Sequence, residues 1–275
     1  MNIYPARGFT ILELLVVVTI IVILLTLLTP ALDNVMFQAH HVKCLTNLRG
    51  IGQAQSLYLQ DNRQTYPPIT TWSTLIGKNG TLNAYGEANP YSGVYGNHES
   101  GSPRLLNIYM GYSDPRGEVP IAECPLDLGD SEPNHVAKEN CYEQYGTSYL
   151  PAFPGHEFAG QLPPASWWRV KNVYGHSENP RIPSVKHNQL TGRTHTKILV
   201  GDWPWHANRL WLSEKTRWHG YKGTDAGPDD PDAFRQLNFL FADGRAELFD
   251  QMQVREIEDR YTPFWTAADR NWKWW

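Results

Sequence analysis

The sequence lacks the motifs that mark several large classes of enzyme. Its 275 residues contain no G-x-S-x-G nucleophile motif, no P-loop, and no C-x-x-C or H-x-x-x-H pair for zinc. Ten histidines are present, but none of their spacings is typical of a metal site. The formal net charge of −4 provides no basic surface for nucleic acid. We therefore expect neither catalysis nor nucleic-acid binding.

Tryptophan is absent from the start of the chain, and charge is nearly absent from the first 32 residues. All 11 tryptophans lie between Trp72 and Trp275. From Leu14 to Leu32 the chain runs for 19 residues without a charge, close to the roughly 20 that span the hydrocarbon core of a bilayer. The remainder is polar and rich in Gly and Pro. This uneven pattern predicts a water-soluble domain attached to a membrane.

Two general interpretations of the N-terminus leave features unexplained. A cleaved secretory signal has a basic start, a short apolar core and a small-residue cleavage site. Here Arg7 is the single basic residue, the apolar run is longer, and TLLTPALDN offers no such site. A plain membrane anchor fits the length of the run. It gives no role to Glu13, an ionisable residue at the edge of that run, where a charge is costly.

The N-terminus resembles the class III signal of type IV prepilins and type II secretion pseudopilins. In that family a short leader ends in Gly, Phe follows, Glu stands four residues further on, and an apolar helix begins. Gly8, Phe9 and Glu13 match these positions, Arg7 gives the basic end of the leader, and Pro30 matches a proline of many pilins.

The resemblance implies processing and assembly. A membrane-embedded aspartyl peptidase is expected to cut between Gly8 and Phe9 on the cytoplasmic side and to methylate the new amino group of Phe9. In a filament, Glu13 of one subunit is expected to meet the amino terminus of a neighbour. Because an unpaired charge in lipid costs several kcal/mol, this ion pair would enforce the register of the subunits.

The helix is predicted to continue beyond the membrane. No proline occurs from Asp33 to Asp61, and apolar residues recur at spacings of three and four: Cys44, Leu45, Leu48, Ile51, Tyr58 and Leu59. We expect one helix from Ile11 to about Gln60, with a bend or local opening at Pro30. The expected divisions are a leader (1–8), a transmembrane helix (9–32), its amphipathic continuation (33–62) and a globular extracytoplasmic domain (63–275).

Two strand signals lie near the C-terminus. Lys197 to Val200 form a short apolar run that leads into Gly201. In LNFLFADGRAELFD, Asp243-Gly244 separates two apolar runs and predicts a hairpin with a type I′ turn. With the resemblance, the expected fold is α+β and pilin-like: a long N-terminal transmembrane and amphipathic helix packed on a C-terminal antiparallel β-sheet with extensive loops.

The C-terminal region carries a second resemblance, to pilin-like proteins abundant in planctomycete- and verrucomicrobia-type bacteria. These end with a His, a nine-residue spacer and Asp-Gly. Asn238 to Arg245, NFLFADGR, fit that ending, but His219 is separated from Asp243 by 23 residues. Any role attached to the family's His is therefore not carried over.

The three cysteines leave two alternatives open. Cys124 and Cys141 lie in loop-like sequence, and a disulfide between them would contribute roughly 3 kcal/mol. Cys44 lies in the helical segment and is expected to be a buried small hydrophobe. The alternative is three thiols.

Two binding sites are also weighed. Asp225, Asp229, Asp230 and Asp232 gather in one loop and suit calcium, which major pseudopilins as a group bind in a C-terminal loop. The spacing is not that of an EF-hand, and a solvated acidic loop is the alternative. The Trp-rich segments 167–168, 202–206 and 272–275 suit either carbohydrate stacking or a packed core.

The expected function is that of a structural subunit of a type IV pilus-like or type II secretion pseudopilus filament. Expected partners are other pilin-like subunits, prepilin peptidase and an inner-membrane assembly platform, with calcium as the one cofactor considered. The expected location is the bacterial inner membrane, with the N-terminus cytoplasmic and the domain periplasmic or on an extracellular filament. The alternative is a membrane-tethered carbohydrate-binding module that uses exposed Trp residues.

Overall fold

The structure is a computed structural model. It describes residues 10–69, 74–78, 80, 104–114, 117–129, 140–151, 173–176, 183–190, 194–195, 197–203, 218–219, 221–222 and 234–251. The chain divides into two compact units, residues 1–40 and 41–275. Each unit is described by itself.

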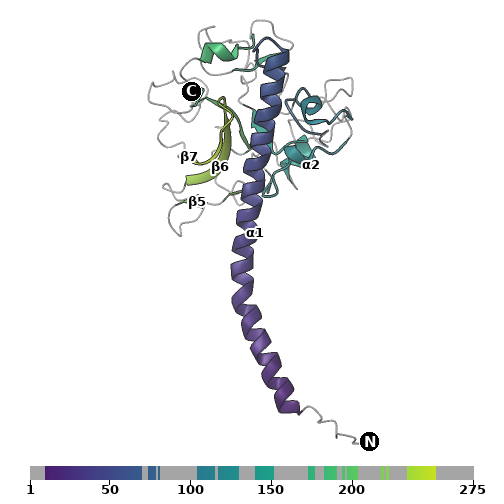
Figure 1. Cartoon of the computed structure of the whole chain (residues 1–275), viewed down its shortest axis with the longest axis vertical. Helices are drawn as coiled ribbons and strands as arrows, with labels where there is room; N and C mark the ends of the chain where they lie inside the picture. Colours follow the sequence, from purple (N-terminus) through teal and green to yellow (C-terminus); the bar gives the residue numbers. More distant parts are fainter. Residues whose placement is uncertain are drawn as a thin grey trace, which may run out of the picture. The chain divides into compact units, whose positions relative to one another are not determined.

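The first element is one long helix, as predicted. α1 covers Ile11–Asp61 and runs from purple to blue in Figure 1. The helix continues through Pro30, whose ring nitrogen has no N–H to donate to the preceding turn. At the other end, the Gln64 N–H donates to the Leu59 carbonyl at 2.7 Å, and Arg63 has a φ of 54°. This left-handed ending satisfies carbonyls that the last helical turn leaves without a partner.

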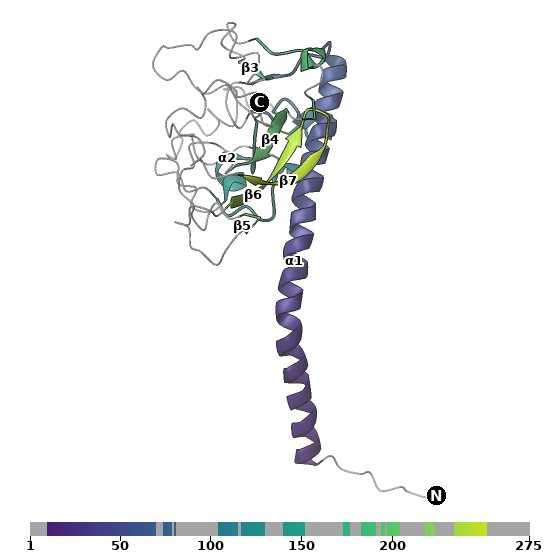
Figure 2. The same ribbon diagram turned by 90° about the vertical axis from the view of Figure 1, so that its left-hand side faces the viewer.

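The part of α1 in the second unit lies in the core. Its buried residues include four of the six predicted apolar positions, together with two amides and two small residues: Cys44, Asn47, Leu48, Ile51, Gly52, Ala54, Gln55 and Leu59. The other two predicted positions, Leu45 and Tyr58, are partly buried against this core. Gly52 is required by close packing, because a Cβ there would lie 2.9 Å from Cδ1 of Leu240. Figures 1 and 2 both show this stretch of α1 beside the C-terminal strands.

The sheet is built around β6 (Phe234–Phe241). One edge of β6 pairs antiparallel with β4 (Ile198–Asp202) and with β5 (Tyr221–Lys222), and the other edge pairs with β7 (Ala246–Gln251). β2 (Tyr149–Pro151) pairs antiparallel with β4. The strands predicted from the two apolar runs are thus confirmed, and all pairs within this sheet are antiparallel.

The turn between β6 and β7 differs from the prediction. The Gly244 N–H donates to the Phe241 carbonyl at 2.9 Å. Gly244 has a φ of +85°, whereas Asp243 is not among the described residues with positive φ. A type I′ turn needs positive φ at both central positions, so the predicted turn type is wrong. A four-residue connection (242–245) lets Gly244 alone adopt the left-handed conformation.

The two faces of β6 have different partners because side chains alternate along a strand. Leu240 faces Gly52 of α1, and Asn238 contacts His41 of the same helix. Residues on alternating positions form a second apolar cluster: Ile198, Leu237, Phe239 and Phe241. The main core gathers α1, β2, β4 and the loops around them.

Short elements occupy the described part of the region between α1 and β4. They are β1 (Pro68–Ile69), parallel to β3 (Gly175–His176); the 3₁₀ helices η1 (Asn107–Met110), η2 (Pro120–Ala122) and η3 (His187–Leu190); and α2 (Cys141–Tyr145). The fold is α+β, with a long N-terminal apolar helix and a C-terminal antiparallel sheet, which confirms the predicted class.

A buried carboxylate organises the loop before α2. Asp127 accepts hydrogen bonds from the N–H groups of Gly129, Cys141 and Tyr142 at 2.8–3.0 Å, and from the Ser148 hydroxyl at 2.6 Å. Burial raises the pKa of Asp127 to about 6, against the opposing effect of these four donors. One side chain therefore joins the loop, α2 and the start of β2.

Candidate functional site

The described chain begins with a helix cap that contains Glu13. One carboxylate oxygen of Glu13, Oε2, accepts hydrogen bonds from the backbone N–H of Thr10 at 2.8 Å and from its hydroxyl at 2.9 Å. The Glu13 N–H donates to the Thr10 hydroxyl at 3.2 Å. This reciprocal arrangement is a capping box, which satisfies donors that a helix start leaves unpaired. In the single chain, Glu13 therefore has a local partner.

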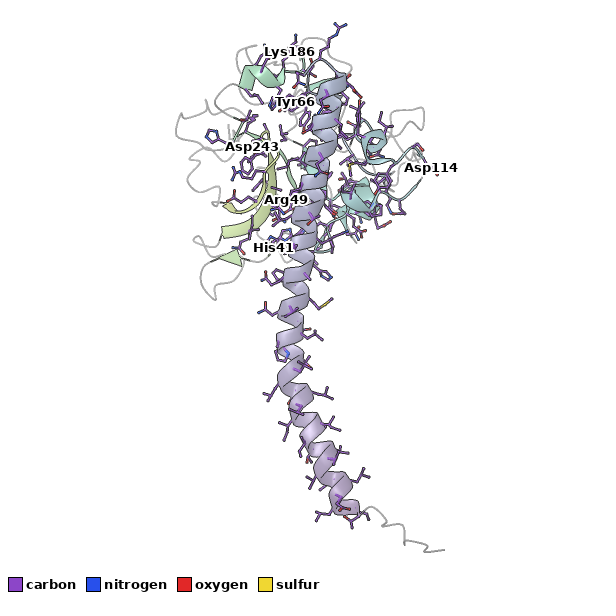
Figure 3. All side chains as sticks on the ribbon, viewed as in Figure 1. His41, Arg49, Tyr66, Asp114, Lys186 and Asp243 are labelled. Atoms are coloured by element: carbon purple, nitrogen blue, oxygen red, sulfur yellow. A yellow bond between two sulfur atoms is a disulfide. The ribbon has the colours of Figure 1, made fainter. Side chains whose placement is uncertain are left out.

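The part of α1 that belongs to the first unit has an apolar surface on all sides. Every residue from Thr10 to Met36 is exposed, and the large apolar side chains between Ile11 and Leu32 are 47–86% exposed. Figure 3 shows these side chains projecting around the helix. α1 is the one helix in the described ranges that is long and apolar enough to span a membrane. Such a surface needs lipid or other apolar helices around it.

Several predicted site residues lie outside the described residues. These are Gly8 and Phe9 at the predicted cleavage site and the four acidic residues of the predicted calcium loop, Asp225, Asp229, Asp230 and Asp232. Their roles remain predictions. Pro30 lies within the exposed, apolar part of α1.

The predicted disulfide between Cys124 and Cys141 is wrong. Cys124 pairs with Cys44 of α1, with a Cα–Cα distance of 5.0 Å, within the range for such bonds. The amide of Asn47, one turn after Cys44, donates to the Glu123 carbonyl at 2.6 Å and holds this loop against the helix. Cys141 is a buried thiol, and its backbone N–H is bound by Asp127. Proximity in sequence favoured the wrong partner because tertiary packing brings α1 to Cys124.

A buried polar cluster lies beside this disulfide. Asn238 of β6 and Asp202 of β4 are both 0% exposed, and His219 is 2% exposed. Nε2 of His219 lies 3.0 Å from Oδ2 of Asp202 and 2.9 Å from Nδ2 of Asn238. The Asn238 N–H donates to Oδ2 of Asp202 at 2.5 Å. Sγ of Cys124 is 3.7 Å from the same Nε2.

His41 connects the cluster to α1. Nε2 of His41 lies 2.9 Å from Oδ1 of Asn238, and the rings of His41 and His219 are 5.1 Å apart. Figure 3 labels His41 on the stretch of α1 beside the strands. Partial burial lowers the pKa of His41, although its contact with Asn238 opposes this effect. The sheet and helix are thus joined by polar contacts as well as by the disulfide.

The sequence pointed to some members of this cluster. Asn238 belongs to the NFLFADGR ending, and His219 is the histidine nearest upstream of Asp243. The contact between His219 and Asn238 was not expected, because 23 residues (220–242) separate His219 from Asp243. In the fold, His219 nevertheless lies beside β6. Asp202 ends β4, but nothing in its local sequence indicated a histidine partner.

The described tryptophans belong to the core. Trp203 and Trp218 are each 1% exposed. The ring of Trp203 stacks on that of Tyr145 with centroids 4.5 Å apart, and the Trp218 indole N–H donates to the Gly129 carbonyl at 3.0 Å. Neither residue offers a face for a sugar. The other tryptophans of the predicted carbohydrate surface lie outside the described residues.

Comparison with known protein families identifies the N-terminal signal. Residues 5–29 match the prokaryotic N-terminal methylation motif. No curated protein and no solved structure matches the chain. The matched segment includes Gly8, Phe9 and Glu13, and it confirms the resemblance of this N-terminus to those of type IV pilin-like proteins and pseudopilins. The resemblance based on the histidine and Asp-Gly of the C-terminal region stays a prediction.

Proposed function

We propose that this protein is a structural subunit of a type IV pilus-like filament or of a type II secretion pseudopilus. The observation that supports this most directly is the N-terminal methylation motif over residues 5–29. Proteins with this motif are generally structural subunits rather than enzymes. The long apolar helix that follows the motif supports attachment to a membrane.

Processing would create the group that Glu13 needs for assembly. Cleavage between Gly8 and Phe9 by prepilin peptidase leaves a charged, methylated amino group on Phe9. In the single chain, Thr10 supplies hydrogen bonds to Glu13 at 2.8 and 2.9 Å. Within a filament, the carboxylate of Glu13 would also pair with the amino terminus of a neighbouring subunit, since an unpaired charge among apolar helices is strongly unfavourable.

The exposed apolar surface of α1 is compatible with two successive surroundings, first lipid and then other subunits. In the inner membrane, lipid would cover the apolar side chains of residues 11–32. After extraction by an inner-membrane assembly platform, the same side chains would pack against the helices of other subunits. The N-terminus would be cytoplasmic before processing, and the globular domain would lie in the periplasm or on the outside of the filament. Calcium at the acidic loop around Asp229 belongs to this proposal.

Mass spectrometry of the chain from the membranes of its native host tests the processing step. We expect a mature chain that starts at Phe9 and is heavier by one methyl group at its amino end. A strain without prepilin peptidase is the control and should retain Met1. A chain that still begins at Met1 in cells with an active peptidase would contradict the proposal.

A further inference from the structure

The two cysteines of the disulfide and His219 form a group of three possible metal ligands. The ligand atoms of Cys44, Cys124 and His219 all lie within 4.8 Å of one another, and each residue is at most 2% exposed. The distance from Sγ of Cys124 to Nε2 of His219 is 3.7 Å. In a tetrahedral zinc site, bond lengths of about 2.0–2.3 Å separate the ligand atoms by about 3.3–3.8 Å. The sulfur and nitrogen already have this spacing.

A carboxylate lies next to the histidine of this group. Oδ2 of Asp202 lies 3.0 Å from Nε2 of His219. The other oxygen of Asp202, Oδ1, is buried and has no hydrogen-bond partner among the described residues, and the same holds for Nδ1 of His219. A buried polar atom without a partner is costly. Oδ1 of Asp202 is therefore a buried acceptor that the described groups do not satisfy and that a bound cation could satisfy.

The surroundings of His219 Nε2 also suit a cation. Nε2 lies 3.0 Å from Oδ2 of Asp202. A neutral imidazole can present a lone pair at Nε2, and the neighbouring carboxylate would attract a cation bound there.

We propose that the reduced chain binds one Zn²⁺ through Cys44, Cys124 and His219, with Asp202 as the fourth ligand. Two thiolates, one imidazole and one carboxylate form a ligand set that suits zinc. The two sulfurs must first be released from each other. In the oxidised chain the Cys44–Cys124 bond occupies both sulfurs, so zinc and the disulfide exclude each other.

The conversion between the disulfide state and the zinc-bound state balances in electrons and protons. A dithiol reductant donates two electrons and two protons, which breaks the Cys44–Cys124 bond, yields two thiols and converts the reductant to its own disulfide. Each thiol then loses its proton as it binds Zn²⁺, so two Zn–S bonds form and two protons are released. Return to the disulfide requires loss of the metal and removal of two electrons by a disulfide oxidant.

Metal titration of the full-length chain in detergent tests the proposal. The chain is reduced with a phosphine under argon, desalted, and titrated with Co²⁺, whose thiolate charge-transfer absorption reports sulfur ligands; ZnCl₂ is then added in competition. We expect about one equivalent bound per reduced chain and none per oxidised chain. Cys141→Ser, which alters the remaining thiol, is the matched control and should bind as the wild type does.

Variants distinguish the predicted ligands. Cys44→Ser and Cys124→Ser should remove the charge-transfer band, and Asp202→Asn should weaken zinc binding. Circular dichroism follows folding in every sample. If reduction unfolds the chain, restoration of the spectrum by ZnCl₂ supports the proposal, and failure to restore it overturns the proposal. A folded, reduced chain that binds no metal, or a Cys44→Ser chain that binds as tightly as the wild type, also overturns it.

Discussion

Residues 11–40 and residues 41–61 belong to one helix, yet their surroundings are opposite. The first stretch is the more apolar, and its side chains are exposed as far as Met36. The second contains Asn47, Gln55 and Gly52, and all three are buried. Burial in α1 therefore follows the partners available to each stretch and not its apolar content. Among the described residues, the first stretch packs against no partner outside α1, which is the property expected of a surface that lipid or other subunits cover.

The strongest test of this contrast concerns Glu13, the acidic residue in the exposed stretch. Replacement by Val should abolish filament assembly, because the amino terminus of the neighbouring subunit loses its partner. Membrane insertion should persist, since the change makes the helix more apolar. Immunoblots of sheared surface filaments and of membrane fractions measure the two outcomes. Thr10→Val, which replaces the hydroxyl of the capping box with a methyl group, is the control and should still assemble.

Normal assembly by the Glu13→Val chain would contradict the proposed filament. Loss of the protein from the membrane fraction would instead mean that Glu13 serves insertion.

In the buried stretch, the largest effect should come from the disulfide. Cys44 and Cys124 are 80 residues apart in sequence, so loss of their bond should lower the free energy of unfolding by about 4.5 kcal/mol in the chain-entropy estimate. Cys44→Ser makes this change, and denaturant unfolding of the oxidised, full-length chain measures it. Cys141→Ala is the matched control, with an expected loss of about 1 kcal/mol. The opposite order of effects would show that Cys141 is the true partner of Cys124.

A pair of leucines compares the two stretches directly. Leu48 is 0% exposed and Leu24 is 61% exposed. Leu48→Ala should destabilise the folded domain by about 3 kcal/mol, because it leaves a cavity in the core. Leu24→Ala should leave that stability unchanged. Thermal unfolding in one detergent measures both variants, and equal losses would mean that the exposed stretch also contributes to the domain.

The smallest effect should come from Asp127, which lies away from α1. Its pKa is raised to about 6 in the folded chain, above the unfolded value of about 3.9. Its contribution to stability is therefore full below the unfolded pKa and is lost as pH rises through 6. From pH 7 to pH 5 it should add about 1 kcal/mol. Unfolding at the two pH values, with Asp127→Asn as the reference, isolates this effect; an equal change in the variant would assign it to other groups.

The sequence predicted the local features of this fold better than its long-range contacts. The apolar run, the spacing of Leu48 and Ile51, and the Asp-Gly turn determine structure over a few residues, so the helix and the hairpin were expected. The pairing of Cys44 with Cys124 depends on where α1 meets a distant loop. The contact of His219 with Asp202 depends on how the chain returns to β6. Neither has a local pattern, and both were missed.

The Cys44–Cys124 bond also has a mechanical consequence. It encloses the 79 residues between the two cysteines in a covalent loop. In the proposed filament, tension would act on each subunit, and a pull applied between a point before Cys44 and a point after Cys124 would pass through the bond. The enclosed residues would reach about 280 Å if fully extended. While the bond is intact, the enclosed residues carry none of this force, and they cannot be pulled into an extended chain.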